Sequence, residues 1–234
     1  MARLLEQVDP ARVRERLAEA EAKIAAACAR GGRDPAQVEI LAATKYVPLE
    51  LMGALAEAGV RLVGENTAQA LIAKQERWAD AFKWDFIGHL QSRKTKQVLP
   101  RARLIHSVES DSVVEQIERH ADGAVRVLLE VNVAGEESKN GVGLDDVDAF
   151  VERASNSAAV VFAGLMTMPP FAAEPDQARP YFQRLRELGE RLREQWAPRH
   201  EFEALSMGTS QDYEVAVEEG ATICRLGGVL YGEE

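Results

Sequence analysis

The chain has 234 residues, 46% of them hydrophobic, which suffices for a large core that needs no disulfide or metal. Its formal net charge of −10 argues against nucleic-acid binding and against an anionic membrane surface. Two cysteines without metal-ligand spacing, Cys28 and Cys224, and a charged amphipathic amino terminus instead of a signal peptide predict a reduced, cytoplasmic protein.

The first predicted element is a helix over residues 8–30. Apolar residues recur there at spacings of three and four, with Glu and Arg between them, as on one face of an amphipathic helix. Gly31 and Gly32 follow and end the helix. No apolar run in the chain approaches the roughly 18 residues that a membrane span needs, so we expect no membrane partner.

Short apolar segments then alternate with helical ones. The strands show little polar alternation, as expected when both faces of a parallel sheet are covered. The predicted strands are 39–44, 61–63, 83–87, 103–106, 125–131, 160–165, 202–205 and 222–226. The predicted helices between them are 49–58, 68–78, 92–98, 111–120, 145–155, 177–195 and 212–219.

Eight such steps at this length favour a single-domain (β/α)8 TIM barrel, an α/β fold, over residues 1–234. The amino-terminal helix, residues 1–30, is expected to pack on the barrel and to occupy the position of the missing eighth helix. An open, doubly wound sheet is the alternative fold. No linker, repeat or low-complexity stretch divides the chain.

Polar and small residues follow the predicted strands, where barrels place their working site. Lys45 follows the first strand, and the later strand ends carry Asn66, His89, Met166 and Arg225. Loops after strands seven and eight often bind phosphate, through backbone N–H groups that glycine lets an anion approach. Here those loops contain Ser206, Met207, Gly208, Thr209, Gly227 and Gly228. A plain helix cap at Ser210 and a plain glycine turn are the alternative reading.

Lys45 is the candidate nucleophile. Partial burial among Asn66, His89 and Arg225 would lower the pKa of its amine, and a neutral amine condenses with an aldehyde to a Schiff base. A lysine at strand one with a phosphate site at strands seven and eight suggests pyridoxal 5'-phosphate (PLP). Arg225 beside the pyridine nitrogen would keep that nitrogen unprotonated; a salt bridge from Arg225 to a nearby Glu is the alternative.

Other polar residues give weaker signals. No two histidines have ligand spacing, so we expect no metal site, and His106, His120 and His200 are assigned no role. His89 is expected to stack on a bound ring or to bond a carboxylate. The basic run of Arg93, Lys94 and Lys96 is expected to be a solvated helix face, although contact with a partner or with a second PLP stays open.

Together these segments resemble the YggS/PROSC family of pyridoxal phosphate homeostasis proteins, from about residue 40 to 232. The matching stretches include ATK at 43–45, GEN at 64–66, GHLQS at 88–92, GEESK at 135–139, LSMG at 205–208 and RLG at 225–227. The resemblance implies a PLP fold-type III barrel like the N-terminal domain of alanine racemase. It also implies PLP on Lys45, phosphate contacts from Ser206 and the backbones near Gly208, Gly227 and Gly228, and Arg225 at the pyridine nitrogen. Thr209 and Gly228 depart from the residues that many members carry.

The resemblance favours a carrier that buffers PLP, or delivers it to apo PLP-dependent enzymes, over an enzyme. The chain ends eight residues past Leu226, which leaves no room for the added domain of a racemase, and we expect Lys45 to point away from Tyr46. We therefore assign no catalytic residue and expect a monomer with an open pocket. Two alternatives stay open: a weak amino-acid racemase, and a Schiff-base enzyme acting on sugar phosphates.

Overall fold

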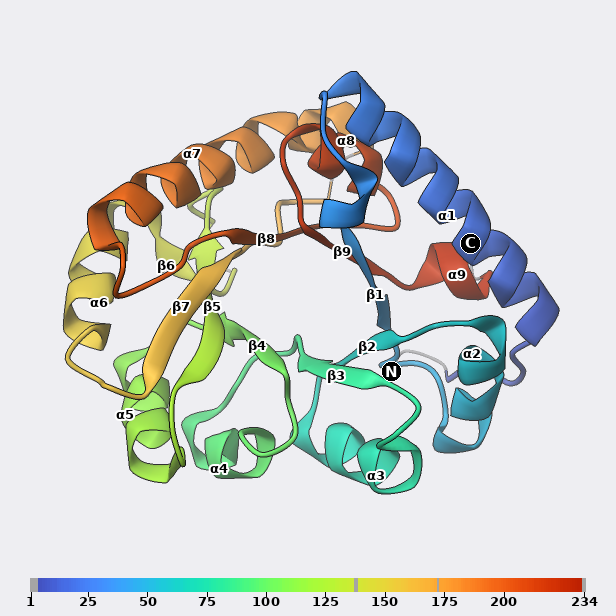
Figure 1. Ribbon diagram of the computed structural model, residues 1–234, viewed down its shortest axis with the longest axis horizontal. Helices are drawn as coiled ribbons and strands as arrows, with labels where there is room; N and C mark the ends of the chain where they lie inside the picture. The colour runs from blue at the N-terminus through green and yellow to red at the C-terminus, as the bar shows by residue number, and fades with distance from the viewer. Residues whose placement is uncertain (1–3, 137–138, 172, 233–234) are drawn as a thin grey trace.

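The computed structural model describes residues 4–136, 139–171 and 173–232, and these form a closed barrel of parallel strands (Figure 1). The ring closes where Ile105 of β4 lies opposite Val127 of β5, and where Leu41 of β1 lies opposite Arg225 of β9. Its strands are β1 (Glu39–Ala43), β2 (Leu62–Glu65), β3 (Lys83–Phe86), β4 (Leu104–Val108), β5 (Val125–Asn132), β7 (Val160–Met166), β8 (Ala204–Thr209) and β9 (Ile223–Leu226). This ring confirms the predicted barrel and excludes the open sheet.

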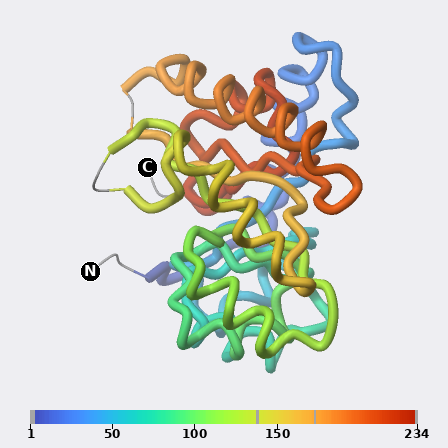
Figure 2. Tube along the Cα trace, turned by 90° about the vertical axis from the view of Figure 1, so that its left-hand side faces the viewer, coloured from blue at the N-terminus to red at the C-terminus, as the bar shows by residue number. Residues whose placement is uncertain are grey.

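Helices lie outside the ring (Figure 1), and the side view shows α7, in orange, running along the barrel (Figure 2). They are α1 (Pro10–Arg30), α2 (Met52–Ala58), α3 (Ala68–Trp78), α4 (Thr95–Val98), α5 (Asp111–His120), α6 (Val147–Ala154), α7 (Arg179–Trp196), α8 (Tyr213–Glu218) and α9 (Gly228–Tyr231). Short 3-10 turns precede or join several of them: η1 (Pro35–Gln37), η2 (Leu49–Leu51), η3 (Ser92–Lys94), η4 (Leu144–Asp146) and η5 (Pro175–Ala178). In the described part of the chain, no helix is long and apolar enough to cross a membrane.

Several strands run further than the sequence predicts, β8 the furthest, and one strand is unpredicted. β8 continues to Thr209 instead of ending at Leu205, because Ser206 pairs with Met166 of β7 and Thr209 pairs with Arg225 of β9. The small polar residues and glycine at 206–209 are typical of a loop, but pairing with β7 on one side and β9 on the other holds them in the sheet. β4 likewise continues to Val108. The extra strand, β6 (Val142–Gly143), pairs with the end of β5.

Helix α1 begins at a clear cap. The Asp9 carboxylate accepts a hydrogen bond from the Ala11 N–H (2.9 Å), and Pro10 occupies the first helical position, where its missing N–H costs nothing. The helix packs against α8, α9 and α2 and so covers the outer side of the barrel near β9 and β1, in blue in Figure 1. Because α9 is only one turn long, α1 supplies most of the cover at this position.

The barrel interior contains both an apolar cluster and buried polar residues. Leu41, Leu62, Leu104 and Leu128 form a small inner cluster, separate from the main core between strands and helices. Successive side chains alternate between the two faces of a strand, and the other inward residues include Asp85, His106, Ser206 and Arg225, all buried. Such a set of polar residues is stable only if its members hydrogen-bond to one another.

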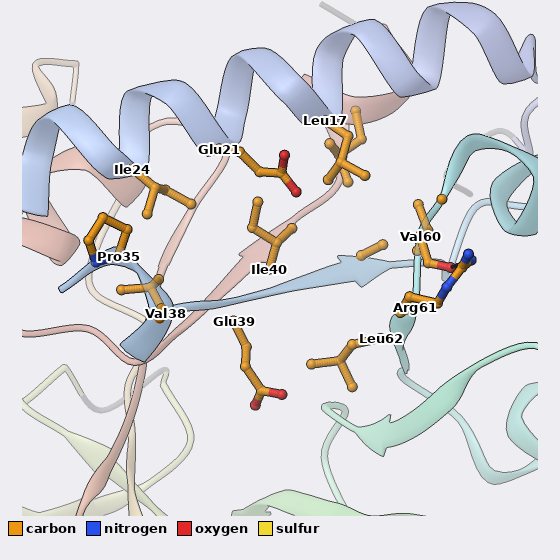
Figure 3. Close-up of a pocket in the computed structure, with 14 residues that line it drawn as sticks. Leu17, Glu21, Ile24, Pro35, Val38, Glu39, Ile40, Val60, Arg61 and Leu62 are labelled. Atoms are coloured by element: carbon orange, nitrogen blue, oxygen red, sulfur yellow. Dashed lines mark hydrogen bonds between the residues drawn. The ribbon is translucent and has the colours of Figure 1, made fainter.

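A groove of about 470 Å³ lies beneath α1 on the outer side of β1. Figure 3 shows Leu17, Glu21 and Ile24 of α1 projecting toward Ile40 of β1. The groove reaches Arg61, which precedes β2, so it opens toward the amino-terminal ends of the strands. It is therefore distinct from the site at their carboxyl ends.

Gly164 of β7 lies where β7 and β8 approach each other closely. A Cβ built at Gly164 would lie 1.8 Å from the Ala204 carbonyl oxygen of β8, whereas one at the exposed Gly123 meets nothing within 4 Å. We predict that Gly164→Ala lowers the free energy of unfolding by about 2 kcal/mol or more, while Gly123→Ala changes it by less than about 0.5 kcal/mol. Urea unfolding followed by circular dichroism measures both, and equal effects would contradict the close strand approach.

Candidate functional site

A cavity of about 870 Å³ opens at the carboxyl ends of the strands, within the size range of small-molecule sites. The amino-terminal segment, through Leu5, and the loop after β5, through Asn140, both line it, and Figure 2 shows these dark blue and yellow-green segments on the same side of the barrel. The predicted site residues that line the cavity are Lys45, Asn66, His89, Met166, Thr209, Arg225, Gly227 and Gly228.

Three predicted contacts do not line this cavity. Ser206 is fully buried beneath it, inside the barrel. Met207 points outward into the main core, and Gly208, with φ +90°, packs against Ala216 and Tyr213. All three lie inside β8, where the sheet and not a loop sets their direction. Ser210, read from the sequence only as a possible helix cap, lines the cavity instead.

Lys45 stands at the cavity mouth, directly after β1. The strand-end pattern predicts partial burial and a direction away from Tyr46, but the side chain is exposed and its Nζ lies 4.7 Å from the centre of the Tyr46 ring. A cation over an aromatic face is favoured electrostatically. The Leu5 N–H donates to the Tyr46 carbonyl (2.9 Å), so the amino-terminal segment borders this part of the mouth.

A buried network fixes the backbone just before Lys45. The Thr44 hydroxyl donates to Glu65 Oε1 (2.5 Å), and Lys74 Nζ donates to that same oxygen and to the Thr44 carbonyl (2.8 Å). Glu65 and Lys74 are buried and form an ion pair between β2 and α3. Breaking a buried pair by removing one partner is strongly destabilising, so this network holds the end of β1 in place.

Arg225 is the buried cation of the site, with 6% of its surface exposed. Its Nη1 donates to Ser206 Oγ (2.6 Å), and its Nη2 donates to the Thr167 carbonyl (2.9 Å) and to Met168 Sδ (2.8 Å). Burial lowers the pKa of Arg225 to about 10, which still leaves it charged at neutral pH. Within the described ranges no carboxylate lies at ion-pair distance from it, so the alternative of a salt bridge is not realised.

Ser206 connects Arg225 to a histidine that the sequence gives no role. His106 Nδ1 lies 2.9 Å from Ser206 Oγ, and His106 Nε2 lies 3.1 Å from Asp85 Oδ2. Arg103 donates to both oxygens of Asp85 (2.9 and 2.8 Å). His106 is therefore part of a buried polar chain; the sequence signal for it is its place at the end of the predicted strand 103–106, after two apolar residues.

Glu130 of β5 is a second residue that the sequence pattern misses. Its carboxyl group lines the cavity and is 7% exposed. Burial and, after it, the Glu109 charge raise its pKa to about 7, against the opposing effect of the Arg225 charge. No hydrogen bond or ion pair to another described residue holds this carboxyl group. In the closed ring β5 is four strands from β1 in either direction, so Glu130 lies across the barrel from Lys45.

His89 and the glycine loop complete the wall. His89 Nδ1 lies 2.7 Å from Glu109 Oε1, so His89 bonds a carboxylate, one of its two expected roles. Ser210 Oγ accepts hydrogen bonds from the N–H groups of Gly227 (3.1 Å) and Val229 (3.2 Å). Asn66 Oδ1 is buried and has no partner among the described residues. The cavity therefore offers hydrogen-bonding groups near Lys45 and Arg225, two of the cationic side chains that line it.

The remaining candidates lie outside the cavity. Arg93 and Lys96 are exposed, and Arg93 bonds the nearby Gln91 (3.1 Å). Glu137 and Ser138 of the GEESK stretch fall outside the described residues. In the part of the chain that is described, no group of three His, Cys, Asp or Glu side chains could hold a metal ion.

Comparison with known proteins identifies the class to which this fold and cavity belong. The model of the family "Alanine racemase, N-terminal domain" matches residues 14–234, and the chain belongs to this family. It is 40% identical over 225 residues to the pyridoxal phosphate homeostasis protein of Aquifex aeolicus, covering 94% of this chain and 97% of that one.

Two solved structures show how far the likeness extends. PipY of Synechococcus elongatus, solved with PLP bound, has a TM-score of 0.80 at 30% identity, covering 94% of this chain and 100% of that chain. Alanine racemase of Clostridium difficile has a TM-score of 0.72 at 13% identity, covering 97% of this chain and 58% of that one. At that identity the racemase shares the fold alone.

The raised pKa of Glu130 leads to a prediction about how the stability of the protein depends on pH. The pKa of its carboxyl is about 7 in the folded protein against an ordinary value of 4.5, so folding favours the protonated form. Its contribution to stability is fully present below about pH 4.5 and is lost as pH rises through 7. We predict that the stability of ligand-free Glu130→Gln, relative to wild type, rises by on the order of 2–3 kcal/mol between pH 5 and pH 8.

Urea unfolding at pH 5, 6, 7 and 8 measures this difference. Glu152→Gln, at an exposed position of α6, is the matched control and should give a difference that does not depend on pH. A pH-independent difference for Glu130→Gln as well would show that Glu130 is ionised throughout this range.

Proposed function

We propose that this protein binds PLP in the cavity and holds it for PLP homeostasis. The observation that carries the proposal is that the Lys45 amine and the buried Arg225 guanidinium face one cavity from the ends of the neighbouring strands β1 and β9. Both the Aquifex aeolicus relative, by its name, and PipY, by its bound ligand, support PLP as the group that such a cavity takes.

The residues present fit this group. The cavity is large enough for it, and the backbone at Gly227, where a Cβ would meet nothing closer than 3.8 Å, leaves room for an anion. The Ser210 hydroxyl, which accepts from the Gly227 and Val229 N–H groups and keeps its own proton to donate, is the group that would hold the phosphate, in place of Ser206. Asn66 Oδ1 supplies a buried acceptor that lacks a protein partner in the described chain. PLP supplies an electrophilic aldehyde and a pyridine ring.

Lys45 would hold the aldehyde covalently. PLP would supply the aldehyde, an electrophile with which a lysine amine can form a Schiff base, and Lys45 would be the residue that holds it. The exposed side chain at the open mouth can reach a ligand in the cavity without crossing a barrier of packed atoms. Arg225, charged and donor-only, would face the pyridine nitrogen and disfavour its protonation, which makes the ring a weak electron sink.

A weak electron sink and an open mouth suit a carrier. The bound group would be accessible to water and to other proteins, so we propose that the protein buffers PLP in the cytoplasm and passes it, as a monomer, to apo PLP-dependent enzymes.

Glu130 favours a second candidate function, slow amino-acid racemisation. It is a carboxyl group with a pKa of about 7 across the barrel from Lys45, and such a group can give and take a proton near neutral pH.

Replacement of Lys45 tests the carrier proposal. We predict that wild-type protein incubated with PLP and reduced with borohydride gains one PLP mass on the peptide containing Lys45, and that Lys45→Ala loses this covalent adduct. Lys83→Ala is the matched control, because Lys83 is exposed at the opposite end of the barrel, where β3 begins. Mass spectrometry of the digested protein reads out both; an undiminished adduct in Lys45→Ala would contradict the assignment.

Racemisation is tested separately. If Glu130 moves a proton, PLP-loaded wild type converts L-alanine to D-alanine slowly and Glu130→Gln does so at least about 100-fold more slowly, the lower end for loss of a general acid–base. Chiral chromatography measures the product. Equal rates for the two proteins would remove Glu130 from the reaction, and no product from wild type would remove this candidate function.

A further inference from the structure

A continuous polar chain runs through the barrel interior from one end to the other. Arg103, which also pairs with Glu39 at the amino-terminal end (2.8 Å), holds Asp85, and Asp85 contacts His106. His106 contacts Ser206, and Ser206 contacts Arg225 at the cavity floor. Asp85, His106 and Ser206 each have 1% or less of their surface exposed, so water does not compete for these bonds.

One arrangement of protons satisfies every bond in this chain. Arg225 can only donate, so Ser206 Oγ accepts from it. Asp85 accepts from Arg103, and as a carboxylate it also accepts from His106 Nε2. The neutral ring then has a free lone pair on Nδ1, which accepts the proton of the Ser206 hydroxyl. Each donor in the chain meets one acceptor.

A charged His106 would break this pattern. Its Nδ1–H and the Arg225 N–H would both donate to Ser206 Oγ, which would leave the Ser206 hydroxyl proton without an acceptor in the chain, and a further cation would lie between Arg103 and Arg225. Burial lowers the pKa of His106, and the charges of Arg225 and Arg103 lower it further, against the opposing effect of Asp85. Neutral His106 is thus the form that matches both the contacts and the surrounding charges.

Arg225 needs this support because its guanidinium is buried without a carboxylate partner in the described chain. The titratable groups whose charges act on it are Cys224, Asp212 and Glu130, and none of them bonds it directly. Ser206 supplies an acceptor whose lone pair is strengthened, because its proton is drawn toward His106 and, through the ring, toward Asp85. Hydrogen bonds in series polarise one another in this way.

We propose that Asp85 and His106, acting through Ser206, are positioning residues that hold Arg225 charged and correctly aimed at the cavity floor. This inference rests on the proposed function, because its effect on a ligand assumes that PLP lies over Arg225. In this assignment Ser206 serves Arg225 and leaves the phosphate to other groups.

The first test needs neither a variant nor a ligand. Nitrogen-15 NMR of wild-type protein with labelled histidine should show His106 as the neutral ring with its proton on Nε2 at pH 7. A ring that is protonated on both nitrogens, or on Nδ1 alone, overturns the proposal.

The second test is a double-mutant cycle on PLP binding. Ser206→Ala removes the acceptor next to Arg225, and Asp85→Asn leaves one acceptor oxygen for three N–H donors. We expect each to weaken PLP binding, by about 10-fold for Ser206→Ala, and to shift the visible absorption band of the bound PLP. In the Ser206→Ala background, Asp85→Asn should add little, because the chain is already cut.

His200→Gln is the matched control. His200 is another buried histidine, bonded to Ser155 Oγ (2.8 Å) and to the Phe162 N–H (3.3 Å), with burial lowering its pKa to about 4, but it lies away from the cavity. It should lower the melting temperature and leave the absorption band unchanged. Additive effects of Asp85→Asn and Ser206→Ala, or variants that melt lower with an unchanged band, overturn the proposal. Failure of wild type to bind PLP refutes the proposed function instead, and the NMR result still decides the proton arrangement.

Discussion

Closing parallel strands into a ring forces every second side chain of each strand into a space from which water is excluded. Leucines fill part of that space, but Asp85, His106, Ser206 and Arg225 also lie in it. Polar groups confined in this way must satisfy one another or destabilise the fold. The direction of Arg225 is therefore set by the ring itself, before any ligand enters.

Two separate buried networks position Arg225 and the backbone before Lys45. Inside the ring, Ser206 and the Thr167 carbonyl hold Arg225. Outside it, the Lys74–Glu65 pair between α3 and β2 holds Thr44, the residue before Lys45. The rigid parts are thus the strand ends, while the Lys45 side chain itself stays exposed and adjustable. A buried guanidinium beside an exposed amine suits a site that takes up a ligand and releases it.

The sequence predicts the barrel, the end of the barrel that carries the site, and most of the cavity residues. It does so because each apolar run identifies a strand, and the polar residues that follow it lie at the carboxyl end of that strand. Lys45 and Arg225 both follow from this pattern. The strand-end pattern fails where the direction of a side chain depends on strand pairing. Pairing with β7 and β9 extends β8 to Thr209, so the Ser206 side chain points into the barrel and Ser210 lines the cavity instead. Glu130 and His106 stand within strands rather than after them, and their inward direction depends on a register that no local signal reveals. The contact between Lys45 and Tyr46 is likewise a matter of side-chain direction.

Helix α1 belongs to the outer cover of the barrel and also, through Arg16 and Glu19, to the wall of the cavity. A conformation in which α1 has detached lacks that wall, so a ligand that touches Arg16 binds the docked form more tightly than the detached one. Ligand occupancy and local opening of the amino-terminal helix are consequently linked equilibria. We expect a ligand that touches Arg16 to slow amide hydrogen exchange along α1, including turns far from the ligand itself.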